Sequence, residues 1–380
     1  MKDIVTVRAQ VVAAFTDSVP PLPEDISRSP RPRDDDGSEA IRSELAGKRW
    51  QDLPAAFLEK RWSSFCYLTP QAYRYYLPAL LVTALDQFED EGDVVHSVLY
   101  GLVPSAHAIY YHGADARAEE RLAQLSPQQI TSVAAFLGLF LNPPNYDHMT
   151  FLAARAMRFG WNRIACPERD AFLAFDWEMR HFEWPEPPDP TRAQLVREIR
   201  EAFSDTPYPG DGNLCGSSQG DEGAECALEF RGVDWKTIHP RLLAYNSASL
   251  SFLSPDGFRY FLPAYLVAWL SGTRCRPTFH LHPCRAARPI RTGPDAFDYA
   301  NSKANAVGET TQEDAVARLS DQEQEQALLY DHWVSQMASF SRPERETIIH
   351  YLKYEAPDDG VGEINAVIEY YWQPSLEEQR

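Results

Sequence analysis

The sequence predicts a mainly α-helical protein with two similar lobes that arose by internal duplication. Three observations support this prediction. A sixteen-residue stretch occurs twice, apolar residues recur at helical spacing in both halves, and no convincing strand or Asn-Gly hairpin pattern is present. With 380 residues, the chain has room for two to three ordinary domains.

The repeated stretch is YLTPQAYRYYLPALLV at 67–82, which returns as FLSPDGFRYFLPAYLV at 252–267. Nine of its sixteen positions are identical at an offset of 185 residues. Three weaker matches lie in the same order, ELAGKRW with EFRGVDW, VVAAFTDSVP with IREAFSDTPY, and SPQQITSVAAFL with SRPERETIIHYL. Collinear matches predict a duplication, and the offset of 215 in the last pair places about thirty extra residues near 273–320 of the second copy.

These matches set the expected domains. We expect a first helical repeat over 1–145, a helical connector and proline-rich linker over 146–190, a second repeat over 191–372 and a tail over 373–380. PEPPDP at 185–190 is predicted to be a stiff linker that cannot continue a helix. PPLPEDISRSPRPRDDDGS in the first copy and PGDGNLCGSSQGDEGA in the second are predicted to be exposed loops.

Helices are predicted at equivalent places in the two copies. Thr191 is the expected N-cap of the first helix of the second copy. Ser126 with Gln129, and Ser341 with Glu344, predict capping boxes before later helices. Apolar positions at i, i+4, i+7 and i+8 predict the first helix of each copy, at Val7, Val11, Ala14 and Phe15 and at Leu195, Ile199, Ala202 and Phe203.

The repeated stretch itself predicts a helix that begins at a proline. Thr69 and Ser254 are each followed by a proline, as in an N-cap with proline at the first helical position. Pro78 and Pro263 lack the amide that a continuing helix needs, so we expect the helix to end or kink there. The apolar run after each proline is then a second, buried helix.

Arg74 and Arg259 stand among the aromatic residues of this stretch, and two interpretations are open. In the structural one, the guanidinium stacks on rings and hydrogen-bonds carbonyl groups freed at the kink. In the functional one, it anchors a carboxylate or phosphate in a pocket. We favour the structural one, because aromatic residues at helical spacing are ordinarily core.

The motif Leu-[Thr/Ser]-Pro-x-x-[Tyr/Phe]-Arg-Tyr-[Tyr/Phe]-Leu-Pro-Ala resembles a family of small bacterial proteins known only as a domain of unknown function. The resemblance extends to AFSDTPYPGDGN at 202–213, FRGVDW at 230–235 and the final capping box, and the second copy is the closer match. The first copy lacks the Tyr-Pro-Gly-Asp element. The resemblance implies a helical fold and brings no activity or catalytic residue.

Charge and composition exclude several functions. The formal net charge is −19, and such a chain repels phosphate backbones, so we expect no nucleic-acid partner. The longest apolar runs are too short to span a bilayer, and the N-terminal stretch lacks the pattern of a signal peptide. Six cysteines without a Cys-x-x-Cys pair favour a reducing compartment. We therefore expect a cytoplasmic protein with no membrane partner; the sequence predicts no oligomeric state.

Two groups of residues are candidates for binding. Tyr208 and Asp211 lie in an acidic loop, YPGDGN, whose oxygen ligands are of the kind that holds calcium, although turn formation explains the loop better. Zinc prefers thiolates and imidazoles, which Cys275, His280, His282 and Cys284 supply within ten residues. Their spacing is not that of a zinc finger, and four neighbouring arginines oppose a cation, so we favour a solvated loop without a cofactor.

The function we favour is a non-enzymatic binding protein, of the immunity or inhibitor kind, that recognises a basic protein partner through acidic loops or the groove between its lobes. No hydrolase elbow, phosphate loop or dinucleotide motif is present. The first alternative is a metal-dependent enzyme that uses the cluster at 275–284 with Asp295 or Asp298. The second is a scaffold subunit of a larger assembly.

Overall fold

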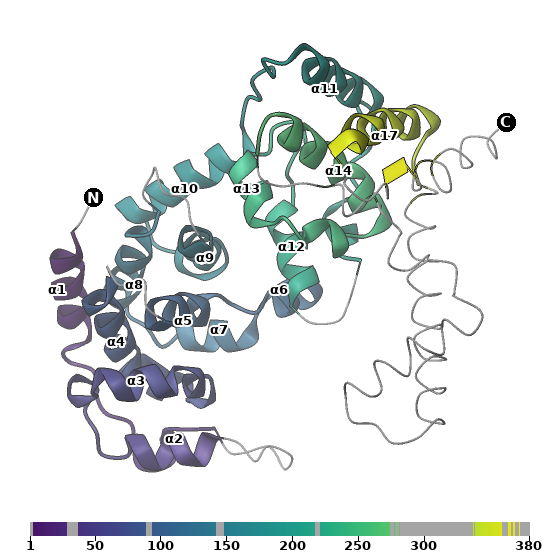
Figure 1. Ribbon diagram of the computed structural model, residues 1–380. Helices are drawn as coiled ribbons and strands as arrows, with labels where there is room; N and C mark the ends of the chain where they lie inside the picture. Colours follow the sequence, from purple (N-terminus) through teal and green to yellow (C-terminus); the bar gives the residue numbers. More distant parts are fainter. Residues whose placement is uncertain are drawn as a thin grey trace, which may run out of the picture. The chain divides into compact units, whose positions relative to one another are not determined.

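The structure, a computed structural model, describes residues 3–28, 37–88, 93–141, 148–216, 221–273 and 339–358, and single positions between 277 and 372. The prediction of a mainly α-helical fold is confirmed (Figure 1). In these residues β-pairing is limited to isolated bridges, Ser27 with Leu68 and Cys215 with Leu253. No described helix combines the length and apolar character needed to cross a membrane. The chain divides into two compact units, Met1–His181 and Phe182–Arg380.

Unit 1 is built from ten described α-helices joined by short 3₁₀ and π turns. The α-helices are α1 (Ile4–Phe15), α2 (Gly37–Leu45), α3 (Ala55–Arg61), α4 (Pro70–Asp86), α5 (Asp93–Leu102), α6 (Ala106–His112), α7 (Ala116–Leu122), α8 (Pro127–Gly138), α9 (His148–Ala156) and α10 (Pro167–Arg180). The 3₁₀ turns are η1 (Pro23–Asp25), η2 (Trp50–Asp52) and η3 (Trp62–Tyr67), and η5 (Met157–Trp161) is a π turn.

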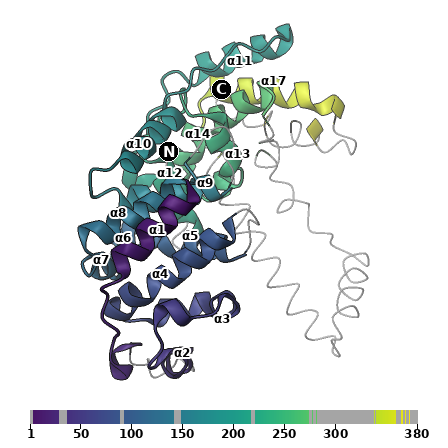
Figure 2. The ribbon, with the colours of Figure 1, turned by 90° about the vertical axis from the view of Figure 1, so that its left-hand side faces the viewer.

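The core of unit 1 forms where α1 packs against α4 and α8 (Figure 2). Val7, Val11 and Phe15 on the predicted apolar face of α1 are fully buried. Asp3 caps this helix, since its carboxylate accepts a hydrogen bond from the backbone N–H of Thr6 at 2.7 Å. The predicted helical spacing at the start of the chain is therefore confirmed.

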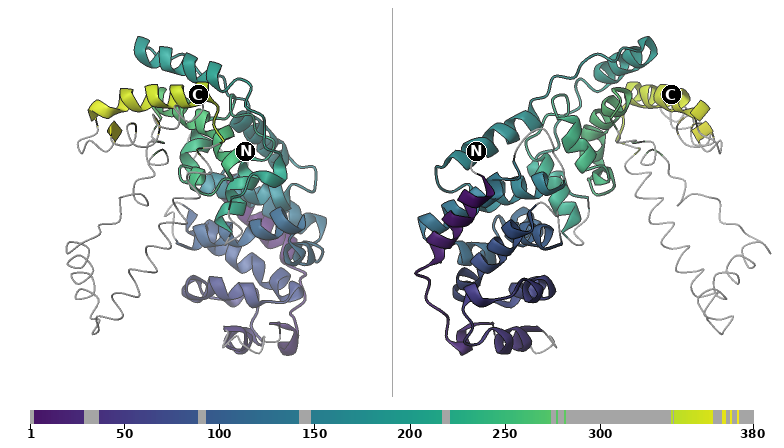
Figure 3. Two further views of the ribbon diagram at one scale, coloured as in Figure 1. Left: turned by 90° about the vertical axis from the view of Figure 1, so that its right-hand side faces the viewer. Right: turned by 60° about the vertical axis from the view of Figure 1, so that its left-hand side comes forward.

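Unit 2 repeats this kind of core with fewer described helices. They are α11 (Pro190–Ala202), α12 (Glu222–Phe230), α13 (Pro240–Tyr245), α14 (Pro255–Leu270) and α17 (Arg342–Glu355), with 3₁₀ turns η6 (Asp211–Asn213), η7 (Ser249–Ser251) and η9 (Ala356–Asp358). Helix α11 packs against α14 and α17, and both views of Figure 3 show the teal α11 beside the yellow α17. Leu195, Ile199 and Phe203 are its buried face.

The helix that follows each repeated cap continues through its proline. Pro78 lies inside α4 and Pro263 inside α14, so the prediction that a second helix begins after each proline is wrong. An internal proline costs a helix about 3 kcal/mol. Burial of the residues around it offsets this cost, because each buried leucine contributes about 1.5–3 kcal/mol, and Leu77, Leu80 and Leu81 are all buried around Pro78.

The capping predictions are confirmed at four of five positions. Thr69 and Ser254 accept hydrogen bonds from the first turn of their helices, at 3.2 and 3.0 Å. Both capping boxes, at Ser126 and at Ser341, are present. The Thr191 prediction is wrong, because Asp189 caps α11 and accepts a hydrogen bond from the N–H of Arg192 at 2.8 Å. Pro190 occupies the first helical position, so the last residue of PEPPDP begins a helix instead of ending the linker.

The stretch predicted as a connector is largely helical. Helices α9 and α10 lie in it and pack on α5 and α8 of unit 1, and the division between the units falls after His181. The predicted loops at 20–38 and 209–224 are not exposed throughout, because Ile26 in the first and Leu214 in the second are fully buried. The residue after each of them forms an isolated β-bridge, Ser27 with Leu68 and Cys215 with Leu253, which holds the segment beside the start of α4 or α14.

Candidate functional site

A pocket with charged walls lies in unit 2 and has a volume of about 620 Å³. We call it the acidic pocket. Its walls come from the C-terminal end of α11, the turn after it, one arginine of α14, and the N-terminal half of α17. The lining includes one arginine and five carboxylate side chains, Glu198, Glu201, Asp205, Glu344 and Glu346.

An ion pair between Arg259 and Glu344 forms the floor of the acidic pocket. The Nε atom of Arg259 lies 3.1 and 3.0 Å from the two carboxylate oxygens of Glu344. Glu344 is 1% exposed, whereas the arginine side chain is 23% exposed. Two further donors reach the same carboxylate, the backbone N–H of Ser341 at 2.6 Å and the hydroxyl of Thr206 at 2.6 Å. The buried charge is therefore paired and hydrogen-bonded, as a buried carboxylate must be.

The sequence places Glu344 there because it is the third residue of a helix with a capping box. In α17, Glu344 folds back to the N-cap residue Ser341. Arg259 follows four residues after the first proline of α14, so it lies on the first turns of a helix that packs beside α11. Packing of α11 against α14 and α17 brings the turn at Thr206 to the same point.

The rim of the acidic pocket carries carboxylates of two kinds. Nδ1 of His350 lies 3.2 Å from a carboxylate oxygen of Glu198. The hydrogen bond from Gln194, and to a smaller extent that from His350, hold the pKa of Glu198 below its ordinary value. Glu346 pairs with Arg342 at 2.9 Å. Glu201 and Asp205 are exposed, and within the described residues their carboxylates have neither an ion pair nor a hydrogen bond. A cation that entered the pocket would therefore meet two uncompensated negative charges.

Unit 1 has a smaller pocket of about 310 Å³ at the corresponding place, among α1, α4 and α8. Here Nε of Arg74 donates to the amide oxygen of Gln129 at 3.0 Å. The amide nitrogen of Gln129 donates to the hydroxyl of Ser18 at 3.3 Å, and its oxygen also accepts from the N–H of Ser126 at 3.0 Å. Asp17 is the one carboxylate residue in this lining. The hydrogen-bonding pattern matches that of unit 2, but a neutral amide stands in place of the buried carboxylate.

Arg74 and Arg259 therefore each line a pocket and bond a side chain. Neither forms the expected bond to a carbonyl group freed by the proline; both bond the third residue of a capping box on the neighbouring helix. This differs from the backbone role that we favoured from the sequence. The guanidinium reaches across to the next helix because α4 packs near α8, and α14 beside α11 and α17, so that the side chain of the third helical residue lies within hydrogen-bond distance.

Tyr208 and Asp211 lie together and close their own loop. The Tyr208 hydroxyl donates to Oδ1 of Asp211 at 2.6 Å and accepts from the N–H of Gly232 at 2.8 Å. Burial, and then the hydrogen bond to Asp211, raise the pKa of Tyr208 above its ordinary value. Both polar groups are thus engaged with the protein itself, and neither lines the acidic pocket.

The candidate zinc ligands Cys275, His280, His282 and Cys284 lie outside the described residues. Among the described residues, no group of three or more His, Cys, Asp or Glu side chains is arranged to hold a metal ion.

The sequence reasoning missed the pocket residues around the arginines. Gln129 and Glu344 were singled out only as helix caps, and Ser18, Thr206 and Glu201 were not singled out at all. A signal was present: Ser18 and Thr206 occupy matching positions in the repeat, as do Gln129 and Glu344. Polar residues at matching positions beside two similar apolar stretches indicate a similar polar contact in each unit.

Fold and pockets together define a class, an all-helical protein in its described part, with two arginine-centred polar pockets and no recognisable catalytic constellation. In a comparison with known families, residues 29–162 match the model of a family of unknown function, DUF6714. The match covers the first occurrence of the repeated stretch. No curated protein and no solved structure matches the chain.

Proposed function

We propose that the chain is a non-enzymatic binding protein that recognises a basic protein partner through the acidic pocket of unit 2. The observation that carries this proposal is the lining of that pocket, in which five carboxylates accompany a single arginine. The formal net charge of −19 also supports the proposal, since it attracts a basic partner from a distance.

The partner side chain that fits the pocket is a lysine or an arginine. Glu201 and Asp205 hold unpaired carboxylates at its rim, and either could pair with an incoming cation. Glu344 contributes little to this pairing, because Arg259 already neutralises it. Binding is therefore expected to be electrostatic and salt-dependent, as it is for immunity or inhibitor proteins that block a basic surface.

We also infer that the two units descend from one duplicated helical unit, and matching local contacts support this. The N–H of Thr69 donates to the carbonyl of Ile26 at 3.1 Å, and the N–H of Ser254 donates to that of Leu214 at 2.8 Å. Each cap hydroxyl also donates to the carbonyl one residue earlier, that of Asp25 or Asn213. The arginine contacts match in the same way. On this view one copy has a neutral glutamine beside the motif arginine, and the other has the buried glutamate and the additional carboxylates of the acidic pocket.

The cytoplasmic location proposed from the sequence rests on the six cysteines without a Cys-x-x-Cys pair. The metal-dependent enzyme and the scaffold subunit stay as alternatives from the sequence. The described residues supply no observation that favours either of them.

Binding of a lysine-rich ten-residue peptide to the full chain tests the proposal. We expect fluorescence anisotropy at low salt to give saturable binding that weakens as salt is raised. The double variant Glu201→Gln/Asp205→Asn removes the two unpaired carboxylates and should raise Kd about fivefold or more, because each such pair contributes about 0.2–1 kcal/mol.

The matched control removes two exposed carboxylates of unit 1 in the variant Asp17→Asn/Glu24→Gln, so the net charge changes equally. This control should bind within about twofold of the wild type. Equal weakening by both double variants would mean that net charge, not the acidic pocket, determines binding. A peptide that does not bind at low salt would contradict the proposal outright.

A further inference from the structure

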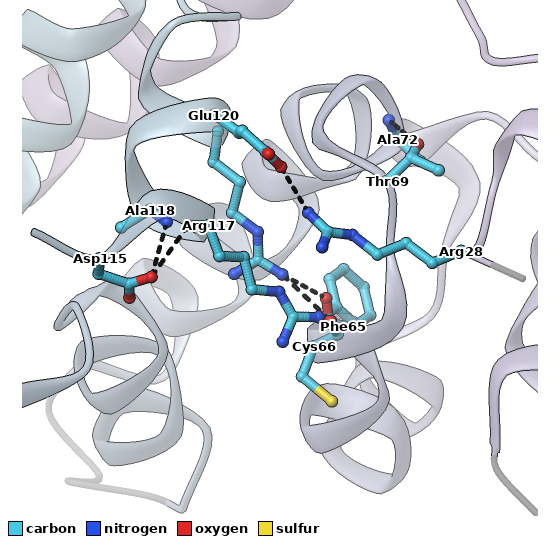
Figure 4. A network of polar contacts seen from close by, with 10 residues as sticks. Arg28, Phe65, Cys66, Thr69, Ala72, Asp115, Arg117, Ala118 and Glu120 are labelled. Atoms are coloured by element: carbon cyan, nitrogen blue, oxygen red, sulfur yellow. Dashed lines mark hydrogen bonds and ion pairs between the residues drawn. The ribbon is translucent and has the colours of Figure 1, made fainter. Parts of the chain in front are cut away.

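Three arginines gather in unit 1 of this acidic chain, Arg28, Arg117 and Arg121, and we call them the arginine cluster. Arg117 and Arg121 are four residues apart on α7, so they lie on the same face of that helix. Figure 4 shows the Arg117 side chain reaching toward the turn that holds Phe65 and Cys66, and the Arg28 side chain pointing to Glu120 nearby. The cluster is separate from both pockets described above.

Two of the three arginines are held in place by the protein. Arg28 pairs with Glu120 at 2.8 Å. One terminal nitrogen of Arg121 donates to the backbone carbonyls of Phe65 and Cys66 at 3.2 and 3.3 Å. The Arg121 guanidinium also lies over the ring of Tyr73, with its carbon 4.1 Å from the ring centre. No carboxylate pairs with Arg121 in the described part of unit 1.

The third, Arg117, has no such support. Within the described residues its guanidinium makes no ion pair and no hydrogen bond, and its Nε is buried without a partner, as is the Nε of Arg121. Burial lowers the pKa of Arg117, and repulsion from Arg121 and then Arg28 lowers it further, which outweighs the smaller opposing effects of Cys66 and Asp115. A half-buried cation beside like charges is unfavourable for the unliganded protein. Such an arrangement is typical of a site that an anion completes.

A small cavity is available at this point. It has a volume of about 50 Å³, with Arg117, Arg121 and Asp115 on its polar side and Tyr73, Leu102 and Trp161 on the apolar side. The carboxylate of Asp115 accepts hydrogen bonds from the backbone N–H groups of Ser105, Arg117 and Ala118 at 2.9–3.3 Å. By the same measure a single water needs roughly 10–15 Å³, so the cavity accommodates a group of a few heavy atoms and no ring system. Its apolar walls lower the local dielectric and strengthen any ion pair formed there.

We propose that the arginine cluster binds a phosphate group, as inorganic phosphate or as the phosphoryl end of a small phosphomonoester. Neither the Arg117 nor the Arg121 guanidinium forms an ion pair with a carboxylate in the described residues, and the one carboxylate of the cavity lining, Asp115, accepts backbone N–H groups instead. A phosphomonoester carries about −1.5 to −2 charges at pH 7 and three acceptor oxygens, which matches two planar donor forks. A carboxylate would neutralise one of them and leave the other uncompensated. This proposal is independent of the basic partner of unit 2.

Isothermal titration of the full chain with inorganic phosphate at pH 7.5 and constant ionic strength tests the proposal, with phenyl phosphate and acetate as parallel ligands. We expect phosphate or phenyl phosphate to bind and acetate to bind at least tenfold more weakly. Preference for one of the two phosphates identifies the source of the group. The Arg117→Gln variant should raise Kd for phosphate about tenfold or more, since hydrogen bonds to charged groups contribute about 1.5–3 kcal/mol.

Arg8→Gln is the matched control, because Arg8 carries the same charge in the same unit and pairs with Asp86 on the surface. It should bind phosphate as the wild type does. Without phosphate, Arg117→Gln should melt at or above the wild-type temperature, which separates lost binding from misfolding. The exposed thiol of Cys66 gives a local readout, since phosphate should slow its alkylation by iodoacetamide. Unchanged affinity in Arg117→Gln, equal binding of acetate, an unprotected Cys66 or no phosphate binding would each overturn the proposal.

Discussion

At the scale of single residues, the two units differ most at the partner of the motif arginine. Arg74 bonds a neutral glutamine, whereas Arg259 bonds a glutamate that is 1% exposed. Losing a neutral hydrogen-bond partner costs about 1 kcal/mol, but leaving a buried charge unpaired costs about 3–5 kcal/mol. The same motif residue is therefore expected to have unequal energetic importance in the two units.

We predict that Arg259→Ala lowers the free energy of unfolding by about 3 kcal/mol and Arg74→Ala by about 1 kcal/mol. The reason is that Arg259→Ala strands the buried carboxylate of Glu344. On a Glu344→Gln background, which copies the arrangement in unit 1, Arg259→Ala should cost only about 1 kcal/mol. Urea unfolding of the four chains measures the coupling. Equal costs of Arg259→Ala on both backgrounds would contradict an electrostatic role for the pair.

We predict that the raised pKa of Tyr76 makes the folded chain less stable in alkali. Burial raises its pKa to about 12, whereas an unfolded tyrosine titrates near 10. Above pH 10 the unfolded chain loses its proton first, so the stability that is complete below pH 10 falls as the pH rises toward 12. The slope from this residue is at most about 1.4 kcal/mol per pH unit.

The Tyr76→Phe variant tests this assignment. It should be less stable at pH 9, because the hydroxyl donates to the carbonyl of Leu45 at 2.9 Å. Between pH 10 and 11.5 it should lose stability less steeply than the wild type. Urea unfolding at a series of pH values provides the comparison, and parallel pH profiles would show that Tyr76 is not the group responsible.

Some of these residues were predictable from the sequence and others were not. The repeat marks Arg74 and Arg259 as special, but the identity of their partners depends on which helix packs beside them. Arg117 carries a weaker signal, since two arginines four residues apart on one helix face is an unfavourable pattern without an anion. Arg28 and the turn at Cys66 come close to Arg117 only through tertiary packing, so no local sequence pattern could predict that they lie together.

At the scale of elements, helix starts follow from local chemistry more reliably than helix ends. Caps at Thr69, Ser254, Ser126 and Ser341 involve atoms within three residues, so the sequence contains the whole interaction. Continuity through Pro78 and Pro263 depends on burial against other helices, which outweighs a local penalty. The wrong prediction of an N-cap at Thr191 could have been avoided from the sequence, because Asp189 followed by Pro190 is itself a strong signal for the start of a helix.

The corrected cap gives a prediction with an internal control. Asp189→Ala should lower the stability of the chain by about 1 kcal/mol, because it removes the acceptor for the N–H of Arg192. Thr191→Ala, two residues away and also exposed, should change stability by less than about 0.5 kcal/mol. Urea unfolding followed by circular dichroism compares the two variants. A larger effect of Thr191→Ala would restore the original capping prediction.

At the scale of the whole molecule, the chain consists of two units that each enclose a core and a separate candidate site. The core of unit 1 joins α1, α4 and α8, and that of unit 2 joins α11, α14 and α17. The sequence predicted the helical class and the repeated stretch. It placed the connector as a separate part, whereas α9 and α10 pack on unit 1, because the apolar faces of those helices match helices earlier in the chain.

We predict that residues 1–181 fold without the rest of the chain and carry the phosphate site alone. The boundary follows His181, and the described helices of unit 1 pack on one another to bury their apolar faces. The fragment should show a helical circular-dichroism spectrum, unfold cooperatively and bind phosphate with the affinity of the full chain. It should fail to bind the lysine-rich peptide, because the acidic pocket is built from residues 198–206, 259 and 341–350. A folded fragment that binds the peptide as tightly as the full chain would contradict the assignment of the basic-partner site to unit 2. An unfolded fragment would show instead that unit 1 depends on unit 2 for its stability.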